Sequence, residues 1–100
     1  MLLFGRQDVN AGMVEFQNTT NAVLLDVRED DEFRSGHIPG ALNIPLSRID
    51  TITIPKDKPL YVYCLRGARS KRAVNALKRM GYANVRSIGG IATYKGRIVQ

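Results

Sequence analysis

The sequence contains one cysteine and no tryptophan, and it lacks any long apolar run. A single cysteine excludes an intramolecular disulfide, so folding does not require an oxidising compartment, and a disulfide cycle would need a thiol from another molecule. A membrane helix needs roughly 18 consecutive apolar residues, and without them we expect no membrane partner. The apolar residues 1–4 have no basic stretch before them and predict a short strand rather than a signal peptide. These features favour a cytoplasmic protein, or a periplasmic one if a leader has been removed.

Acidic side chains are absent from residues 58–100, which carry ten basic ones, whereas residues 1–57 carry all nine acids and five basic residues. Aromatic residues do not alternate with the basic ones as base stacking requires, so no nucleic-acid partner is expected. The simplest explanation is a field that concentrates small anions; a solvated basic face and an acidic protein partner remain open. The length of 100 residues fits one domain, 1–100.

Short apolar segments alternate with helix-like patterns along the whole chain. The strand patterns lie at residues 1–4, 23–27, 41–44, 60–63 and 85–88. The helix patterns lie at residues 8–16, 28–35, 45–49, 70–80 and 91–94. This order predicts an α/β fold, a small doubly wound parallel sheet of about five strands with helices on both faces. In such sheets, ligands bind beyond the carboxyl ends of the strands.

Cys64 follows the apolar strand pattern 60–63 and opens a loop that leads into an amphipathic helix pattern. The loop residues are Leu65, Arg66, Gly67, Ala68, Arg69 and Ser70. A strand that turns through such a loop into a helix brings backbone N–H groups and a helix N-terminus together, which stabilises an anion. With the two arginines, these groups lower the pKa of a thiol. The residues therefore predict a reactive Cys64 with an anionic substrate, although a free cysteine is more often a small buried apolar residue.

Several residues of this region are expected to act through structure. We expect Ser70 to be the N-cap of the helix, with a hydroxyl that can reach the sulfur. Asp26 lies in the apolar strand pattern 23–27 and needs a partner, because burying an unpaired carboxylate is costly; Arg28 is the expected one. Gly89 and Gly90 are expected to form a turn into the last short helix.

Two groups of motifs resemble the signatures of rhodanese domains, with the same order and spacing over about residues 20–96. The first comprises Leu25-Asp26-Val27-Arg28-Glu29, Glu32-Phe33, Gly36-His37-Ile38-Pro39-Gly40-Ala41 and Asn43-Ile44-Pro45. The second comprises Tyr63-Cys64 with its loop and helix, Gly81-Tyr82 and Gly89-Gly90. One departure is Tyr94, which stands in a segment where the family often has tryptophan.

The resemblance implies a single-domain sulfurtransferase of the thiosulfate type. Its Cys64 thiolate would take the outer sulfur of thiosulfate or a similar donor and hold it as a persulfide, until cyanide or a thiol accepts it. The backbone N–H groups of Leu65 to Ser70 would stabilise the thiolate and the persulfide, without metal or organic cofactor. His37 lies in a signature shared by the whole family, which favours a structural hydrogen bond over a general base.

Loop length separates the alternatives within the superfamily that the resemblance suggests. Cys64 to Arg69 is a six-residue loop, the sulfurtransferase length. The related phosphatases have a loop one residue longer that ends in a phosphate-binding arginine, and here Ser70 takes that place. An arsenate reductase has the same difficulty and needs a second cysteine. The remaining alternative is a non-catalytic binding module of the same fold that docks an acidic partner through residues 58–100.

Overall fold

The fold is built on a parallel sheet in which the first described strand lies in the interior, between later strands of the chain. The computed structural model describes residues 7–100, so the strand expected at residues 1–4 lies outside the described residues. The described strands are β1 (Val23–Asp26), β2 (Leu42–Asn43), β3 (Leu60–Cys64) and β4 (Val85–Gly90). All pair in parallel in the order β2-β1-β3-β4. The predicted doubly wound α/β fold is confirmed, with four strands rather than five in the described part.

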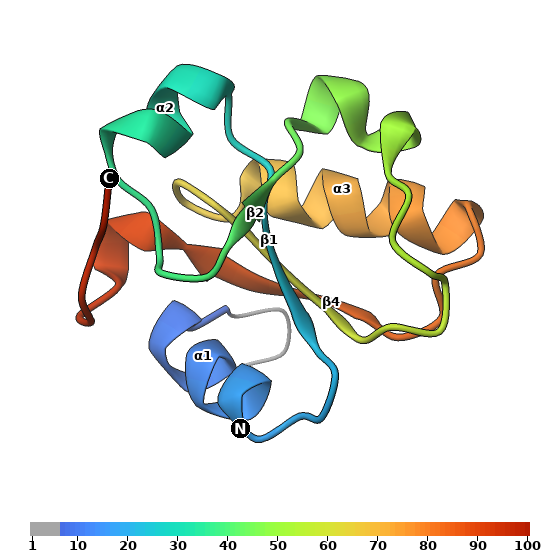
Figure 1. The fold of residues 1–100 in the computed structure, drawn as a ribbon, viewed down its shortest axis with the longest axis horizontal. Helices are drawn as coiled ribbons and strands as arrows, with labels where there is room; N and C mark the ends of the chain where they lie inside the picture. Colours follow the sequence, from blue (N-terminus) through green and yellow to red (C-terminus); the bar gives the residue numbers. More distant parts are fainter. Residues whose placement is uncertain (1–6) are drawn as a thin grey trace.

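Helices cover both faces of this sheet, as predicted. The described α-helices are α1 (Val9–Gln17), α2 (Asp30–Ser35) and α3 (Ala68–Arg79), and two 3-10 helices are η1 (Leu46–Thr51) and η2 (Ile91–Thr93). In Figure 1, α1 lies below the sheet, whereas α3 and η1 lie above it. No described helix is long and apolar enough to cross a membrane.

Strand β3 divides its side chains between two apolar cores because successive residues of a strand point to opposite faces. Tyr61 and Tyr63 pack with Val9 and Met13 of α1, whereas Val62 and Cys64 belong to the core beneath α3. All five residues of β3 are buried. The alternation therefore directs Cys64 towards the face on which α3 begins.

Helix α1 contains a glycine near its centre, Gly12, which faces β4. A Cβ atom at this position would lie 2.4 Å from Cβ of Ile88, so α1 packs against β4 more closely than any side chain would permit. The glycine weakens the isolated helix, but it allows the contact that holds α1 on the sheet. The helix is capped by Asp8, whose side chain accepts the N–H of Asn10 at 3.0 Å.

Two local predictions next to Cys64 are wrong. Helix α3 begins at Ala68 with Gly67 as its N-cap, so Ser70 lies inside the first turn. Gly89 and Gly90 do not form a turn but end β4, where they pair with Tyr63 and Cys64. The reason for the second difference is a close contact with the loop, because a Cβ atom on Gly90 would lie 2.0 Å from the carbonyl oxygen of Leu65.

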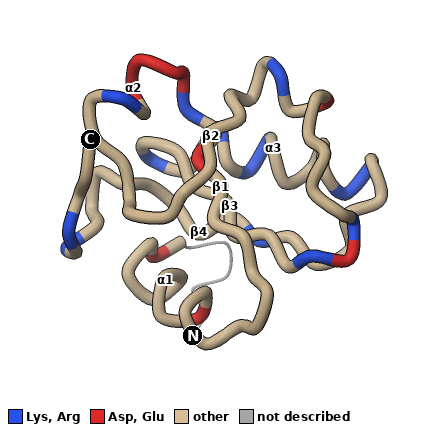
Figure 2. Tube along the Cα trace, in the orientation of Figure 1, with Lys and Arg blue, Asp and Glu red and all other residues tan. Residues whose placement is uncertain are grey.

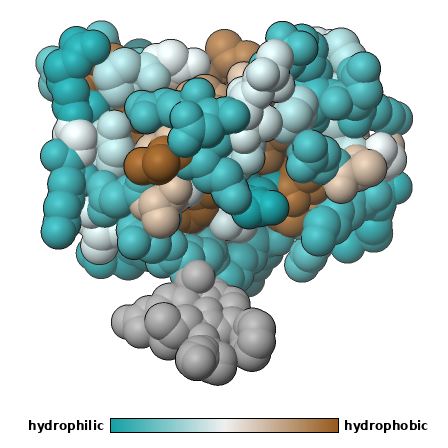
Figure 3. Space-filling model, turned by 90° about the horizontal axis from the view of Figure 1, so that it is seen from below, coloured by the Kyte–Doolittle hydropathy of each residue, from teal (hydrophilic) through white to brown (hydrophobic). Residues whose placement is uncertain are grey.

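In the folded chain, acidic and basic side chains are concentrated on different helices. Figure 2 shows basic residues along α3 and acidic ones on α2. Viewed from below the orientation of Figure 1, the surface is mostly hydrophilic, with apolar residues in small separate patches (Figure 3). Among the described residues, the exposed large apolar side chains are Val14, Leu42 and Ile98. Scattered residues of this kind are normal on a protein surface and do not mark a binding site.

Candidate active site

Cys64 lies at the carboxyl end of β3, next to the point where the strand order reverses. Strand β1 pairs with β2 on one side and with β3 on the other, so the connections leave the carboxyl ends of β1 and β3 in opposite directions. A crevice forms at such a place in open α/β sheets, and ligands bind there. Cys64 itself is 1 % exposed. The structure thus places the predicted nucleophile where this class of fold binds its substrates.

The loop after Cys64 turns back so that its N–H groups point at the sulfur. The N–H of Gly67 donates to Sγ at 3.0 Å, and the N–H of Ser70 donates to it at 3.4 Å. Gly67 has φ +111°, a conformation that other residues rarely adopt, and it begins α3 directly from the loop. The positive end of the α3 dipole therefore adds to the two N–H groups at Sγ.

Ser70 contributes its hydroxyl as well as its backbone, as predicted. Its side chain is fully buried, and its Oγ lies 3.7 Å from Sγ of Cys64. The same Oγ is 3.0 Å from the carbonyl oxygen of Gly67 and 2.7 Å from Oγ of Ser87. The sulfur consequently has a hydroxyl beside it in addition to the backbone donors.

Opposing effects set the pKa of the Cys64 thiol. Burial acts to raise this pKa, because it disfavours the charged form. The backbone and hydroxyl of Ser70, followed by the N–H groups of Gly67 and Arg66, act to lower it, and together they bring the pKa below its ordinary value. The loop therefore favours the thiolate, which is the nucleophilic form of cysteine.

The two arginines of the loop have different surroundings. Arg69 forms a bidentate ion pair with Glu32 of α2, with Nη1 at 2.6 Å and Nη2 at 3.0 Å from the carboxylate oxygens. Hydrogen bonding to Arg69 lowers the pKa of Glu32 to about 2. Arg66 is exposed, and no carboxylate of the described chain pairs with it. Arg66 therefore carries the free positive charge of the loop, although the place of Arg69, where the loop meets the helix, favours Arg69 for binding an anion.

Glu32, like Ser87, is one of the residues of this region that the sequence does not single out as functional. It is held in place by a capping box, in which its carboxylate accepts the N–H of Glu29 at 2.9 Å. The sequence signals for it are its place in the Glu32-Phe33 motif and the acidic first turn of the predicted helix, which is typical of a helix N-terminus. Its partner lies 37 positions away and is brought to it by the fold.

Asp26 has the partner that a buried carboxylate requires. Its oxygens accept hydrogen bonds from Nε and Nη2 of Arg28 at 2.7 to 3.1 Å. Both residues are buried, and Nη2 of Arg28 also donates to the carbonyl oxygen of Gly36 at 2.7 Å. The pair ties the end of β1 to the end of α2, which gives both residues a structural role.

His37 also joins separate segments. Its Nδ1 is 2.8 Å from the carbonyl oxygen of Phe33, and its ring stacks on that of Phe33 with 3.7 Å between the centroids. Its backbone pairs with Val99 in an isolated antiparallel bridge. These contacts link α2 to the C-terminal segment. Within residues 7–100, no group of three or more His, Cys, Asp or Glu side chains could hold a metal ion.

Comparison with known proteins agrees with this arrangement. Residues 10–96 match the family described as the rhodanese-like domain. The chain belongs to this family. It is 38 % identical over 71 residues to the thiosulfate sulfurtransferase PspE of Escherichia coli (strain K12), covering 67 % of this chain and 68 % of PspE. The rhodanese-like chain thus has sulfurtransferases among its relatives.

One further relative and one solved structure match about four fifths of this chain. YqhL of Bacillus subtilis (strain 168), an uncharacterized protein, is 44 % identical over 80 residues, which are 77 % of this chain and 64 % of YqhL. The chain therefore spans less than two thirds of the length of YqhL. The solved structure of a rhodanese with anions from E. coli is 31 % identical, with a TM-score of 0.71, and the match covers 79 % of this chain and 98 % of that one.

Proposed function

We propose that this rhodanese-like domain is a sulfurtransferase that carries sulfur as a persulfide on Cys64. The observation that carries the proposal is the convergence of two backbone N–H groups, at 3.0 and 3.4 Å, on the sulfur of Cys64. In the first step the thiolate attacks the outer sulfur of thiosulfate. The sulfur–sulfur bond of the donor breaks, sulfite leaves with the bonding electrons, and Cys64 retains the outer sulfur as a persulfide anion.

The second step returns the enzyme to its starting state. Cyanide or a thiolate attacks the outer sulfur of the persulfide, and the Cys64 thiolate leaves with the electron pair of the bond that breaks. A thiol with a lowered pKa is a better leaving group in such an exchange. The same donors that favour the thiolate before the reaction therefore also favour its release.

The donor anion is bound by Arg66 rather than by Arg69. The charge of Arg69 is balanced by its bidentate pair with Glu32, whereas Arg66 is an exposed loop residue that no carboxylate of the described residues pairs with. A hydrogen bond to a charged group is worth about 1.5 to 3 kcal/mol. We therefore expect Arg66→Gln to raise KM for thiosulfate at least about tenfold with little change in kcat, as measured by initial rates. An unchanged KM would assign the donor to other groups.

A phosphatase is disfavoured by the surroundings of Ser70 and Arg69. The side chain of Ser70, in the place of the phosphatase arginine, is fully buried, and the preceding arginine is bound by Glu32. Bidentate binding of a phosphate by an arginine would require Arg69 to leave its present partner. An acidic protein partner that docks through residues 58–100 stays a prediction that is compatible with either role.

The function is tested by the rate of thiocyanate formation from thiosulfate and cyanide. We expect turnover by the native chain and none by Cys64→Ser, a variant that keeps the shape of the side chain. Circular dichroism of both proteins establishes that the variant is folded. No turnover by the native chain would support a binding module, and equal turnover by the variant would exclude Cys64 as the nucleophile. Hydrolysis of p-nitrophenyl phosphate in place of sulfur transfer would favour the phosphatase.

A further inference from the structure

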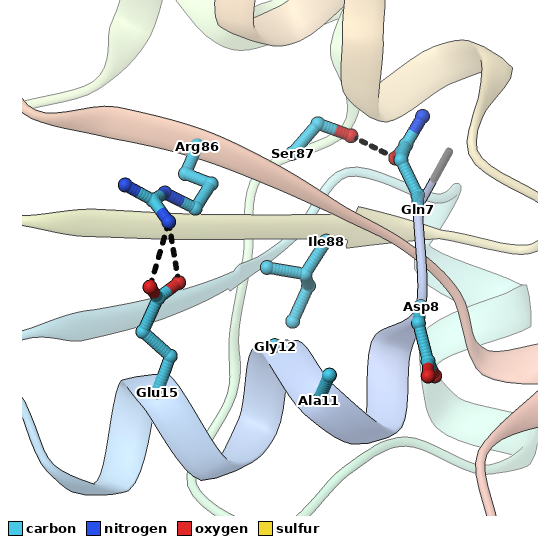
Figure 4. A pocket seen from close by; sticks show the side chains of 8 residues that line it. All are labelled: Gln7, Asp8, Ala11, Gly12, Glu15, Arg86, Ser87 and Ile88. Atoms are coloured by element: carbon cyan, nitrogen blue, oxygen red, sulfur yellow. Dashed lines mark hydrogen bonds and ion pairs between the residues drawn. The ribbon is translucent and has the colours of Figure 1, made fainter. Parts of the chain in front are cut away.

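A chain of three polar side chains leads from the sulfur of Cys64 to the segment before α1. Oγ of Ser70 lies 3.7 Å from Sγ of Cys64 and 2.7 Å from Oγ of Ser87 on β4. The hydroxyl of Ser87 in turn donates to Oε1 of Gln7. Figure 4 shows this last contact, in which Gln7 reaches along the edge of β4 to meet Ser87. The order of contacts is therefore Cys64, Ser70, Ser87 and Gln7.

An irregularity in the backbone of β4 lies next to Ser87 and Gln7. The register of β4 shifts between Ser87, which pairs with Val62, and Gly89, which pairs with Tyr63, so one extra residue is accommodated in β4. Such a bulge re-aims the side chains that flank it. A Cβ atom on Gly89 would lie 3.2 Å from Cβ of Gln7, so the missing side chain at this position leaves room for Gln7.

Gln7 also lies against the loop that surrounds the sulfur. A Cβ atom on Gly67 would be 3.3 Å from Nε2 of Gln7, and the N–H of Gly67 is the shortest donor to Sγ. The amide of Gln7 thus lies in the space that a side chain at Gly67 would enter, and it is joined to Ser70 through Ser87. These contacts connect the segment before α1 with the site.

The direction of the hydrogen bonds in this chain matters because each serine hydroxyl has a single proton to donate. In the thiol form, S–H donates to Oγ of Ser70, and Ser87 donates to Oε1 of Gln7, so the 2.7 Å contact between the two serines requires the Ser70 hydroxyl to donate to Ser87. The carbonyl oxygens of Gly67 and Gly89, at 3.0 and 3.5 Å, compete for the same proton. A thiolate can only accept, so the Ser70 hydroxyl bonds to it only by turning from these acceptors towards Sγ. The reversal is complete when Ser87 donates to Ser70 and the Gln7 amide rotates to donate to Ser87.

We propose that Ser87 and Gln7 are positioning residues that set the direction of the Ser70 hydroxyl and, through it, stabilise the anionic sulfur of Cys64. A donor behind the Ser70 hydroxyl strengthens its bond to the anion, because hydrogen bonds in a chain polarise one another. The thiol proton itself passes to solvent, since the chain ends in an amide that does not take up a proton. The inference extends the proposed function. Stabilisation of the persulfide by these residues rests on that function, whereas stabilisation of the thiolate does not.

The test is the pH dependence of Cys64 alkylation by iodoacetamide, which reports the pKa of the thiol. We expect Ser87→Ala to raise this pKa by roughly half a unit and Ser70→Ala to raise it by about one unit. Ser87→Thr keeps the hydroxyl and should restore the native value. Ser47→Ala, which removes an exposed hydroxyl on η1, is the matched control and should shift nothing.

Gln7 is tested with a side chain that can only accept. In Gln7→Glu the carboxylate holds the hydroxyl of Ser87, so Ser70 is drawn away from the sulfur and the pKa of Cys64 should rise. The new charge also acts through space, and a double-mutant cycle with Ser87→Ala separates the two effects. We expect less than half of the Gln7→Glu shift to remain in the Ser87→Ala background.

None of these variants changes a charged group on the elements around Cys64, and only Gln7→Glu adds one. They are Arg66 and Arg69 of the loop, Glu32 of α2, the Asp26–Arg28 pair at the end of β1, Lys71 and Arg72 at the start of α3, and Arg86 of β4 with Glu15 of α1. A native pKa in Ser87→Ala, or a Ser87→Thr variant that does not restore it, would overturn the proposal. Alkylation needs no sulfur donor, so failure of the proposed function would be seen separately, as absence of thiocyanate.

Discussion

Replacing Glu32 with glutamine removes the charge from the Glu32–Arg69 pair and keeps the shape of the side chain. Glutamine at this helix position can still accept the N–H of Glu29, because the capping box accommodates either residue. The variant therefore isolates the ion pair between α2 and the start of α3. We expect it to be less stable than the native chain at neutral pH.

The magnitude follows from the pKa of Glu32, which hydrogen bonding to Arg69 lowers from 4.5 to about 2. The full difference corresponds to about 3 kcal/mol. The two side chains are 31 % and 30 % exposed, so solvent screening reduces the expected contribution to about 1 to 2 kcal/mol. Because the pKa is lowered in the folded state, this stability is present above pH 4.5 and is lost as the pH falls towards 2.

The assay is urea unfolding at a series of pH values from 7 down to about 2.5, followed by circular dichroism. The difference in free energy of unfolding between the native chain and Glu32→Gln should shrink over the acidic half of this series. Asp31→Asn is the matched control, since Asp31 lies in the same helical turn, is exposed and has no ion pair within the described chain. A difference that stays constant with pH would refute the reasoning.

Three further predictions concern the framework of the site. Gly90→Ala places a Cβ atom 2.0 Å from the carbonyl oxygen of Leu65, so it should cost about 1 to 3 kcal/mol in thermal unfolding and slow thiocyanate formation; native behaviour in both assays would contradict the close contact. Asp26→Asn leaves the buried guanidinium of Arg28 without its carboxylate and should cost about 3 to 5 kcal/mol in chemical denaturation; a loss below about 1 kcal/mol would argue against the pair. The alkylation rate of Cys64 should reach its midpoint below the pH of an ordinary free thiol, and a midpoint at or above that value would contradict the donors at Sγ.

The elements that carry the site could be predicted because their patterns are local. The apolar run of β3 and the amphipathic repeat of α3 are read within a few residues, and they place Cys64 between a strand and a helix. Alternation of strands with helices predicted the parallel sheet. Residues 1–4, expected as a further strand, lie outside the described residues.

The exact start of α3 could not be predicted from residue preferences. Serine is a far more common N-cap than a glycine with positive φ, so Ser70 was the natural choice. The structure uses Gly67, because the loop must turn tightly enough to aim its N–H groups at Sγ. Neither the bulge in β4 nor the close approach of the loop to Gly90 is revealed by a pattern within β4.

The partners of the loop residues are contacts between distant parts of the chain. Arg69 meets Glu32, and Ser70 meets Ser87, only after the sheet and α3 have formed. From the sequence, either loop arginine could bind the anion, and Arg69 is favoured because it lies where the loop meets the helix. The sequence therefore predicted the loop residues around Cys64 but not the distant partners, Glu32 and Ser87, that bind two of them.

The most direct test of the central claim is the intact mass of the chain after incubation with thiosulfate and removal of the excess. We predict a gain of one sulfur atom, which disappears when cyanide or a thiol is added and is absent in Cys64→Ser. Peptide mapping should place the added sulfur on Cys64. No gain in mass, or a gain that persists in Cys64→Ser, would contradict a persulfide carried by this cysteine.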